Sequence, residues 1–584
     1  HNYTYDLGGR LLTDTDAMGR TLEYAYNRDN SLNTLTLKDF HNADGSKRDV
    51  VITSNTYDGA GNVLTEASSD GKDVTKYTYT ATGQVATEVE NPSGVMRRTA
   101  YTYDLAGNVK KTVSTGSTSN SLQPSLGLSQ TVTFDYDTAG RQVAQSVVDN
   151  NASAAPSRTS TYKYDQRGLV VAQTDPRGNV AGASAADFTS TYEYDQMSRR
   201  VSSTAPAVST ENVGGAAASV KSKVLTGYNT YDDEVASRDP LGNIATATVD
   251  RLGRVVKQTG TPYKAPGSST SVTPSSTVEY DEAGNVVKAT DARGAYTTYV
   301  YDKLDRLITQ SQPTSDNDTR AVWHYTYNRV GEVLSVRDPR GGEVQSTYDD
   351  LDRAITSTQV ERYPYADNYT TKFAYDDSGR LTSTTSPTGA VSTNTYDTLG
   401  QLTTTTDPNG VKTQYGYDEQ GNTIRVTDGL GRTTQNTYDG FGQLAQESDV
   451  NAAGKILRTQ SYSYDAAGNL LQALSPLGTK RTYTYDALGQ LTKQTEPTSD
   501  AHTITTSFGY DANGNRTRYT DGRGNDFTYT FNSLGLAESA VEPSTKAYPN
   551  AADRTWAVSY DVNGNPVKLV APGGVTRNRT FDAA

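Results

Sequence analysis

Between residues 375 and 442 the sequence repeats one word, Tyr-Asp-x-x-Gly, at intervals of 21 residues. The copies are Tyr375-Asp376-Asp377-Ser378-Gly379, Tyr396-Asp397-Thr398-Leu399-Gly400, Tyr417-Asp418-Glu419-Gln420-Gly421 and Tyr438-Asp439-Gly440-Phe441-Gly442. We predict that the shared positions are the structural residues of the repeat: Tyr375, Asp376, Gly379, Tyr396, Asp397, Gly400, Tyr417, Asp418, Gly421, Tyr438, Asp439 and Gly442. A fixed period of this length indicates that one small supersecondary unit is stacked many times.

The same word runs through the whole chain of 584 residues. Further clean copies begin at Tyr5, Tyr57, Tyr103, Tyr136, Tyr164, Tyr280, Tyr464, Tyr485, Tyr510 and Tyr560. The stretch from about 195 to 275 is the least regular, with degraded copies at Tyr231-Asp232 and Val249-Asp250. We therefore predict one continuous repeat region over residues 1–584. Because the chain closes on Phe581-Asp582, the opening of another copy, we expect it to be a fragment of a larger protein.

The repeated word has the chemistry of a tight turn. Asp at the first turn position and Gly at the last are typical of a type I turn followed by a residue with positive φ, a common hairpin closure. A second word, Asp407-Pro408-Asn409-Gly410, lies between two copies and recurs from Asp175, Asp239 and Asp338. Each period therefore holds two turns and two short strands, which predicts an all-β fold of tandem hairpins.

The residues between the turns favour strands. Leu402-Thr403-Thr404-Thr405-Thr406 is rich in β-branched residues, and Tyr415 stands two positions before Tyr417, which puts both rings on one face of a strand. With hairpins in register we expect ladders of stacked tyrosines, at about 0.2–1 kcal/mol per pair. The Ser/Thr/Gly/Pro/Ala-rich insertions are predicted to be loops or longer hairpins on a rim: Ser114 to Gln130, Val148 to Ser157, Ala205 to Val220 and Thr261 to Ser276.

Composition excludes several classes of function. Only 34% of the residues are hydrophobic, which predicts a thin sheet with little core rather than a conventional globular domain. The net charge of −13 argues against nucleic acid as a partner, because phosphate binding needs a basic surface. The sequence contains no run of about 18 apolar residues, so it predicts no membrane span. The absence of cysteine excludes disulfides and thiolate metal sites.

The chemically reactive residues form no catalytic pattern. The carboxylate pairs Asp14 with Asp16, Asp349 with Asp350 and Asp376 with Asp377 could serve acid–base chemistry or Ca²⁺ binding, but turn formation explains them better. The four histidines, His1, His41, His324 and His502, lie far apart in the sequence. We predict no catalytic residue, no cofactor site and no metal site, and hence no enzymatic activity.

The repeats resemble the YD repeats of the Rhs family, which also occur in the B and C components of Tc toxins, in wall-associated bacterial proteins and in teneurins. The fuller family pattern, Tyr-Asp-x-x-Gly-Arg-Leu, stands at Tyr375 to Leu381, and Gln401 replaces its Arg in the next copy. The resemblance implies a long antiparallel sheet that spirals into a hollow shell, or cocoon. In the Rhs and Tc branches the shell holds a C-terminal toxin, which an Asp-Pro-x-Gly-Leu core motif helps to release. This chain departs from that motif, with Asn179, Asn243, Gly342 or Val411 in place of the Leu.

The resemblance implies a non-enzymatic shell, secreted or held at the cell envelope of a bacterium, that encloses a C-terminal toxin for bacterial competition until delivery. Its partner would be its own C-terminal toxin or cargo, and secretion-apparatus proteins are further candidates. The alternative is a cell-surface or wall-associated adhesin that binds glycans or neighbouring cells through tyrosine-rich faces. A glycan-binding assay discriminates the two, because only the adhesin depends on exposed aromatic rings.

Overall fold

The computed structural model describes residues 1–42, 44–68, 71–117, 130–150, 157–211, 217–266, 268–314, 320–361, 366–498 and 502–582. Strands make up almost all of the regular structure.

The strands of the first half of the chain are β1 (Asn2–Tyr5), β2 (Leu11–Thr15), β3 (Thr21–Tyr26), β4 (Leu32–His41), β5 (Lys47–Tyr57), β6 (Val63–Ser68), β7 (Asp73–Tyr79), β8 (Val85–Glu90), β9 (Arg97–Tyr103), β10 (Val109–Gly116), β11 (Gln130–Tyr136), β12 (Gln142–Asp149), β13 (Arg158–Tyr164), β14 (Val170–Thr174), β15 (Thr189–Tyr194), β16 (Arg200–Thr210), β17 (Ala218–Tyr228), β18 (Glu234–Arg238), β19 (Ile244–Val249), β20 (Val255–Thr259), β21 (Tyr263–Lys264), β22 (Ser271–Val272), β23 (Ser275–Tyr280), β24 (Val286–Thr290), β25 (Tyr296–Tyr301) and β26 (Leu307–Pro313).

Those of the second half are β27 (Arg320–Tyr327), β28 (Val333–Arg337), β29 (Glu343–Tyr348), β30 (Ala354–Glu361), β31 (Asp367–Tyr375), β32 (Leu381–Thr385), β33 (Val391–Tyr396), β34 (Leu402–Thr406), β35 (Lys412–Tyr417), β36 (Thr423–Thr427), β37 (Thr433–Tyr438), β38 (Leu444–Val450), β39 (Ile456–Tyr464), β40 (Leu470–Leu474), β41 (Lys480–Tyr485), β42 (Leu491–Pro497), β43 (Thr503–Tyr510), β44 (Arg516–Thr520), β45 (Asp526–Phe531), β46 (Ala537–Val541), β47 (Thr555–Tyr560), β48 (Pro566–Val570) and β49 (Thr576–Asn578). Short 3-10 turns are η2 (Pro176–Asn179), η3 (Ala185–Phe188), η4 (Ala551–Arg554) and η5 (Pro572–Gly574).

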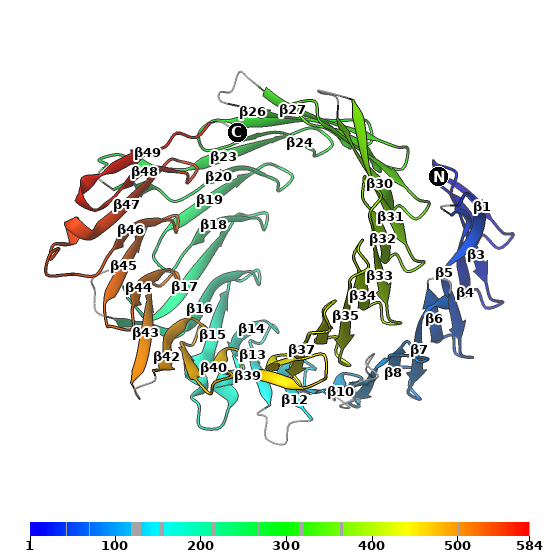
Figure 1. The fold of residues 1–584 in the computed structure, drawn as a ribbon, viewed down its shortest axis with the longest axis horizontal. Helices are drawn as coiled ribbons and strands as arrows, with labels where there is room; N and C mark the ends of the chain where they lie inside the picture. The colour runs from blue at the N-terminus through cyan, green and yellow to red at the C-terminus, as the bar shows by residue number, and fades with distance from the viewer. Residues whose placement is uncertain are drawn as a thin grey trace. The chain divides into compact units, whose positions relative to one another are not determined.

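These strands confirm the predicted all-β fold of tandem hairpins. An antiparallel sheet contains 47 of the strands, and along it successive strands pair in chain order, as β31, β32, β33 and β34 do (Figure 1). The insertion after β20 forms the small ribbon β21–β22, and β20 then pairs with β23. In such a meander every second turn lies on the same rim of the sheet. We call the rim of the Tyr-Asp-x-x-Gly turns the YD rim and the other the opposite rim.

The turn geometry explains the repeated word. In the turn of residues 376–380 the Gly379 amide donates to the Asp376 carbonyl over 3.0 Å, and the Asp376 amide donates to the Arg380 carbonyl, also over 3.0 Å. Gly379 has a φ of 80°, a left-handed conformation that glycine adopts without steric cost. The register shifts where Tyr375 pairs with Leu381, as expected for a type I turn closed by a bulge.

The described residues group into two compact units, each built from separate stretches of the chain. Unit 1 contains His1–Gly140, Gln145–Ser157 and Trp323–Gln460. Unit 2 contains Arg141–Ala144, Arg158–Val322 and Ser461–Ala584. Within each unit, hairpins from the first half of the chain therefore lie near hairpins from the second half.

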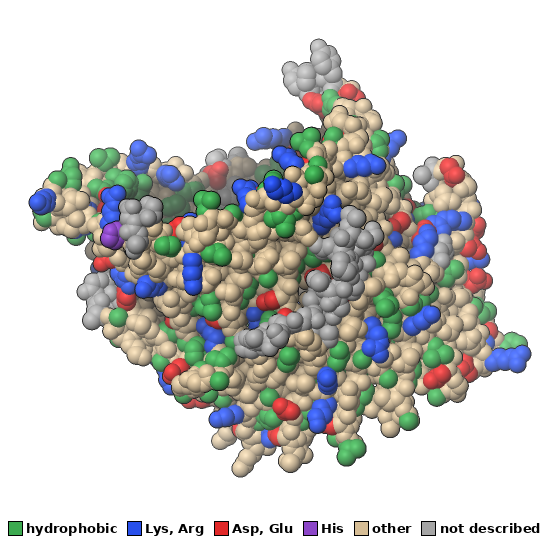
Figure 2. Space-filling model, turned by 60° about the horizontal axis from the view of Figure 1, so that its bottom comes forward, with side chains coloured by type: hydrophobic (Ala, Val, Ile, Leu, Met, Phe, Trp, Pro, Cys, Tyr) green, Lys and Arg blue, Asp and Glu red, His purple; other side chains and the backbone are tan. Residues whose placement is uncertain are grey.

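Buried apolar side chains are few, as the composition predicts. Leu37, Phe40 and Val50 form one buried cluster in unit 1, on the long hairpin β4–β5. On the face in Figure 2, acidic and basic side chains are interspersed among uncharged polar ones, without a patch of one sign. Stability must therefore come mainly from hydrogen bonds and from partial burial along the sheet.

The irregular stretch needs one correction. Tyr228 and Asn229, rather than Tyr231 and Asp232, hold the first two repeat positions, because Tyr228 pairs with Glu234 across the turn. Tyr231 is a turn residue with 86% of its surface exposed. The described parts of the 205–220 insertion lie in β16 and β17, and those of the 261–276 insertion include β21–β22, in agreement with the expected longer hairpins; residues 212–216 and 267 lie outside the described residues. Of the other two insertions, residues 118–129 and 151–156 lie outside the described residues.

Candidate functional site

The repeat aspartate caps its own turn. Asp376 Oδ1 accepts the Arg380 amide over 2.9 Å, and Asp376 Oδ2 accepts Arg380 Nε over 2.7 Å. Asp397 does the same with Gln401, whose amide and side-chain Nε2 lie 2.9 and 2.8 Å from its carboxylate. The other predicted pairs of aspartate and glycine, Asp418 with Gly421 and Asp439 with Gly442, close turns of the same geometry.

The repeat tyrosine joins each hairpin to the one before it. Tyr396 donates its hydroxyl to the Leu381 carbonyl over 2.8 Å, across the sheet from β33 to β32. Arg380 lies over the Tyr396 ring, 5.4 Å from its centroid, and its Nη1 reaches the Asp397 carbonyl over 3.2 Å. The same hydroxyl bond to a backbone carbonyl is made by Tyr57, Tyr79, Tyr103, Tyr136, Tyr164, Tyr194, Tyr228, Tyr280, Tyr301, Tyr348, Tyr375, Tyr417, Tyr438, Tyr510 and Tyr560. We call this arrangement the repeat clasp.

The clasp replaces the expected tyrosine ladders. The ring pairs recorded in the described part of the chain are His1 with Tyr3 and the run Phe508, Tyr519 and Phe527. Tyr375, Tyr396, Tyr417 and Tyr438 form none of them, so for this run the ladder prediction is wrong. The hydroxyls of all four tyrosines donate to backbone carbonyls instead, because a half-buried hydroxyl needs an acceptor. An arginine side chain also lies over the rings of Tyr375 and Tyr396.

A second feature, which sequence reasoning missed, is a lateral seam inside each unit. In unit 1, YD turns of residues 349–440 contact opposite-rim segments of residues 20–149. Asp377 binds both Arg48 and Lys72, and Ser378 donates to Asp73 over 2.5 Å. The remaining contacts of the unit 1 seam join Arg20 to Asp352, His41 to Asp350, Thr398 to Val95, Arg97 to Gln401 and Glu419, Gln130 to Gly440, and Asp149 to Gly440.

The buried cluster lies beneath this seam. Leu351, in a YD turn of the second half, packs against Leu37, Phe40 and Val50 of the first half. Burial alone would raise the pKa of the Asp377 carboxyl, but hydrogen bonds from Lys72 and Arg48 outweigh it and hold that pKa below its usual value. The seam therefore combines apolar contact with ion pairs that keep Asp377 charged.

Unit 2 has an equivalent seam. Arg177 of the Asp-Pro-x-Gly turn donates to the Asp486 and Ala487 carbonyls over 2.8 and 2.9 Å. Tyr263, only 3% exposed, donates to the Tyr560 carbonyl over 2.8 Å. Further contacts of the unit 2 seam join Ser222 to Ala512, Asp239 to Asn513, Pro262 to Ser533 and Asp291 to Asn563.

Glu211 makes the most extensive contact of the unit 2 seam. Its carboxylate accepts Arg518 Nε and Nη2, each over 2.8 Å, and its amide donates to the Tyr510 carbonyl over 2.7 Å. An added Cβ on Gly509 would lie 2.1 Å from Glu211 Oε2. Gly440 is equivalent in unit 1, where a Cβ would lie 2.2 Å from Asp149 Cγ. At both positions the absence of a Cβ therefore leaves room for an acidic side chain from the opposite-rim segment across the seam.

Some residues that the sequence singled out have seam roles. The sequence predicts turn formation for Asp350 and Asp377. Instead, their neighbours Asp349 and Asp376 cap the turns. Asp350 and Asp377 bind residues across the seam. His41 donates from its backbone amide to Asp350 over 2.8 Å, while His324 lies exposed on β27. The sequence signal that could have indicated the seams is the pair of glycines Gly440 and Gly509, because neither stands at the turn-glycine position of the repeated word.

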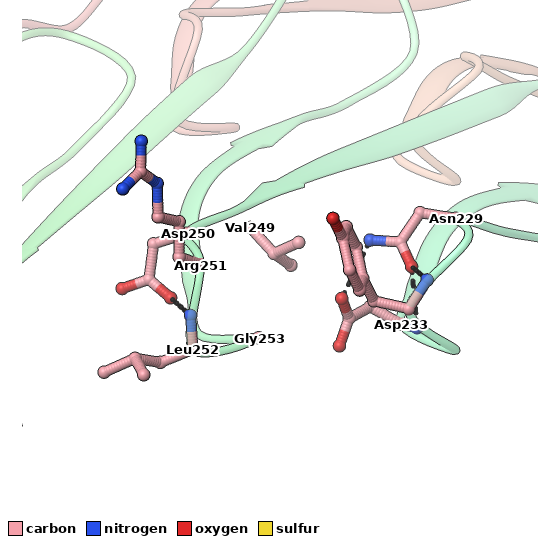
Figure 3. A pocket seen from close by; sticks show the side chains of 8 residues that line it. Asn229, Asp233, Val249, Asp250, Arg251, Leu252 and Gly253 are labelled. Carbon is pink, nitrogen blue, oxygen red and sulfur yellow. Dashed lines mark hydrogen bonds between the residues drawn. The ribbon is translucent and has the colours of Figure 1, made fainter.

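A metal site would need several titratable side chains that lie close together. The described residues contain no group of three or more His, Cys, Asp or Glu side chains placed to hold a metal ion. A hollow of about 810 Å³ in unit 2 lies between the adjacent turns 229–233 and 249–253 of the YD rim (Figure 3). Its carboxylates take part in turn contacts: Asp250 accepts the Leu252 amide over 2.8 Å, and Asp233 accepts Nδ2 of the capping residue Asn229, also over 2.8 Å. Among the helices within the described ranges, none has the length and apolar character to cross a membrane.

Comparison with known families identifies the architecture. The family model described as the teneurin YD-shell matches residues 174–367, 275–476 and 363–571, which together span more than half of the chain. No curated protein sequence matches.

Solved structures agree in fold. A crystal structure of TcdB2-TccC3 without its hypervariable C-terminal region superposes with a TM-score of 0.62 at 14% identity, covering 94% of this chain and 30% of that one. TcdB2-TccC3 with Cdc42 gives a TM-score of 0.58 at 13% identity, covering 98% and 39%. The Photorhabdus luminescens Tc holotoxin pore gives 0.60 at 14%, covering 95% and 34%. This chain thus spans about a third of the length of these proteins.

Proposed function

Because the chain belongs to the teneurin YD-shell family, we propose that it is wall material of an Rhs-type bacterial toxin, a non-enzymatic shell that encloses the C-terminal toxin of its own polypeptide until delivery. The observation that carries this proposal is the pairing of YD and opposite rims within each unit. A wall that confines a polypeptide needs its hairpin rows joined laterally, and the seams join them through side chains of both halves.

The chemistry of the wall fits confinement without reaction. The repeat clasps engage tyrosine, aspartate and arginine side chains in contacts between hairpins, so these groups are committed to structure. On the face seen in Figure 2, side chains of both charges are interspersed, which is consistent with a wall that does not attract a cargo of one charge. We extend the proposal to location: a secreted protein or one of the bacterial cell envelope, with secretion-apparatus proteins as transient partners.

Protease protection tests the enclosure. The natural full-length protein is treated with a nonspecific protease at a temperature where the repeats stay folded, and the fragments are identified by mass spectrometry. We expect segments outside the repeats to be cut far more slowly than the same segments expressed alone. Glu211→Ala, which removes the contact with Arg518, should speed that cutting, whereas the matched control Glu282→Ala, at an exposed turn position, should not. Equal cutting rates with and without the repeats would exclude enclosure.

The adhesin alternative depends on aromatic faces free to bind sugars. The hydroxyls of the clasp tyrosines already bind backbone carbonyls. An arginine side chain lies over the rings of Tyr164, Tyr228, Tyr280, Tyr375 and Tyr396. Tyr231 is the most exposed tyrosine among the described residues, with 86% of its surface accessible. A glycan array probed with this chain and with Tyr231→Ala decides: saturable binding that the substitution abolishes would favour the adhesin.

A further inference from the structure

The chain contains three Asn-Gly sequences, at Asn409, Asn513 and Asn563, and each lies in an Asp-x-Asn-Gly turn. Asparagine loses its side-chain amide most readily before glycine, because glycine has no side chain to hinder attack by its backbone nitrogen. The three turns have nearly the same geometry: the glycine has a φ of 81°, 87° or 86°, and its amide donates to the aspartate carbonyl over 3.0, 3.0 or 3.1 Å. They differ in what the asparagine side chain contacts.

Two of the three asparagines join the two sides of the unit 2 seam. Asn513 Nδ2 donates to Asp239 Oδ2 over 2.6 Å, and Asn513 Oδ1 accepts the Leu241 amide over 3.3 Å. Asn563 donates from its side-chain amide to Asp291. Both asparagines are exposed, so water reaches them, whereas both aspartates are half-buried in opposite-rim turns. Each contact therefore depends on a neutral amide that faces a carboxylate.

Deamidation would replace that amide by a negative charge. In the first step the backbone nitrogen of Gly514 attacks Asn513 Cγ: the N–Cγ bond forms, the Cγ–Nδ2 bond breaks, and ammonia leaves with the proton of the Gly514 amide. Water then opens the cyclic imide at either carbonyl, which restores the backbone N–H and gives aspartate or isoaspartate. Water is the only co-reactant. The donor to Asp239 thus becomes a second carboxylate.

The closed seam opposes this reaction. Two hydrogen bonds hold the Asn513 side chain toward the Asp239 turn, and the Gly514 amide donates to the Asp511 carbonyl over 3.0 Å. Attack on Cγ requires the side chain to turn back toward its own backbone and the glycine amide to leave its acceptor. We therefore expect deamidation to proceed while the seam contact is open.

We propose that Asn513 and Asn563 are sites of spontaneous deamidation, and that the reaction makes opening of the unit 2 seam irreversible. The carboxylate that forms after opening would face Asp239 or Asp291 when the seam closes again. Two carboxylates that share a site repel each other, and half-burial weakens the screening of that repulsion by water. Arg293 Nε lies 3.5 Å from Asp291 Oδ2 and offsets part of the repulsion there. The larger effect is therefore expected at Asn513.

This inference goes beyond the proposed function, because it concerns contacts inside unit 2. It holds or fails whether or not a toxin is enclosed. Its consequence is a wall that loses lateral contacts at two defined turns as the protein ages.

Substitutions that reproduce the product test the effect on the seam. Asn513→Asp in the full-length protein should raise hydrogen exchange at the Leu241 amide at least about tenfold, as expected for loss of a hydrogen bond to a charged group. Asn409→Asp, in a turn of unit 1, is the matched control and should leave that exchange unchanged. Asp239→Asn combined with Asn513→Asp should restore protection, because donor and acceptor are exchanged. Asparagine suits the capping position, as Asn229 shows in an equivalent turn.

Peptide mapping by mass spectrometry tests the reaction itself. The full-length protein is incubated at mildly alkaline pH, and aspartate and isoaspartate are measured over time at the three Asn-Gly sequences. Asp239→Ser removes the acceptor of Asn513 but keeps a capping oxygen, as Ser475 does in its own Ser-Pro-Leu-Gly turn. It should speed deamidation of Asn513 by about tenfold, the factor expected for a lost hydrogen bond to a charged group. The rates at Asn409 and Asn563 should not change.

Circular dichroism checks that each variant is folded. Should Asn513→Asp fail to fold, partly deamidated wild-type protein replaces it, and the fraction with fast exchange at Leu241 should equal the fraction deamidated at Asn513. Three results would overturn the inference. They are an Asn513 that keeps its amide in Asp239→Ser while the denatured protein is converted, exchange at Leu241 that is unchanged by the new carboxylate, and a double variant that does not regain protection.

Discussion

Removing the Glu211 carboxylate tests how much one seam contact contributes to stability. In Glu211→Ala, Arg518 loses two charge-assisted hydrogen bonds of 2.8 Å. The two side chains are 24% and 21% exposed, between a surface pair worth at most about 1 kcal/mol and a buried one whose disruption costs about 3–5 kcal/mol. We therefore expect the opening free energy of the local region to fall by about 2 kcal/mol.

Gly509 turns this prediction into a double-mutant cycle. Gly509→Ala places a Cβ 2.1 Å from Glu211 Oε2, so the carboxylate must move and its bonds to Arg518 weaken. In the Glu211→Ala background that collision is absent. The cost of Gly509→Ala should therefore be smaller there, with a coupling of about 1–2 kcal/mol between the two positions.

Hydrogen exchange is the appropriate assay, because a stacked repeat opens in segments and a single unfolding free energy does not describe it. The amides of residues 503–520, in β43 and β44, should exchange faster in Glu211→Ala, while β31 and β32 in unit 1 should not change. Glu282→Ala removes an exposed glutamate from a turn and serves as the matched control. Unchanged protection in β43 and β44, or an equal cost of Gly509→Ala in both backgrounds, would refute the reasoning.

Three further predictions concern single positions. Tyr396→Phe removes the hydroxyl bond to the Leu381 carbonyl and should lower local stability by about 1 kcal/mol, seen as faster amide exchange in β32 and β33 but not in β43. Asp377 has a folded-state pKa below its ordinary 3.8, so its contribution to stability is present above pH 3.8 and is lost as pH falls through the folded pKa. Acid titration followed by exchange in turn 375–379 should show that loss, and Asp377→Asn should show a weak seam with little such pH dependence. Gly400→Ala, at a φ of 78°, should lower the local opening free energy by about 1–2 kcal/mol, seen as faster amide exchange in β33 and β34, and unchanged exchange there would contradict the turn geometry.

The turns could be predicted from the sequence because their interactions are local. Asp397 caps the amides of Leu399 and Gln401, two and four residues further along. Such contacts depend on residue type and short spacing, which the repeated word displays directly. The hairpin meander could be predicted as well, since two turns in each 21-residue period leave room only for short strands, such as β32 (Leu381–Thr385) and β33 (Val391–Tyr396).

The tyrosine clasp was within reach of the sequence but was assigned to the wrong interaction. Both stacking and hydroxyl donation fit tyrosines spaced by whole hairpins. Hydroxyl donation is favoured over ring stacking because Tyr396 is half-buried and its hydroxyl donates to a backbone carbonyl of β32. An unpaired hydroxyl at that place would cost about 1–3 kcal/mol. Arg380, at the position after the glycine, then covers the ring that a second tyrosine would have covered.

The seams could not be predicted, because their partners lie far apart in sequence at separations that vary, from 271 residues for Pro262 and Ser533 to 332 for Arg20 and Asp352. Arg97 and Gln401, for example, are separated by 304 residues. Which opposite-rim turn meets which YD turn depends on how many residues each intervening hairpin and insertion contributes. No short sequence pattern indicates this total length of chain between two seam partners.

The variable positions of the word therefore carry the lateral specificity. The shared Tyr, Asp and Gly are satisfied within a repeat or by the adjacent hairpin, and they would be the same in any stack of this kind. The x positions project from the rim, where Asp377 binds Arg48 and Lys72 and where Gly440 makes room for Asp149. Exchanging the shared residues between repeats should then leave the register of the seam unchanged, whereas exchanging the x residues of two seated turns should destroy it, because charge and volume at the rim are the features that distinguish one turn from the next.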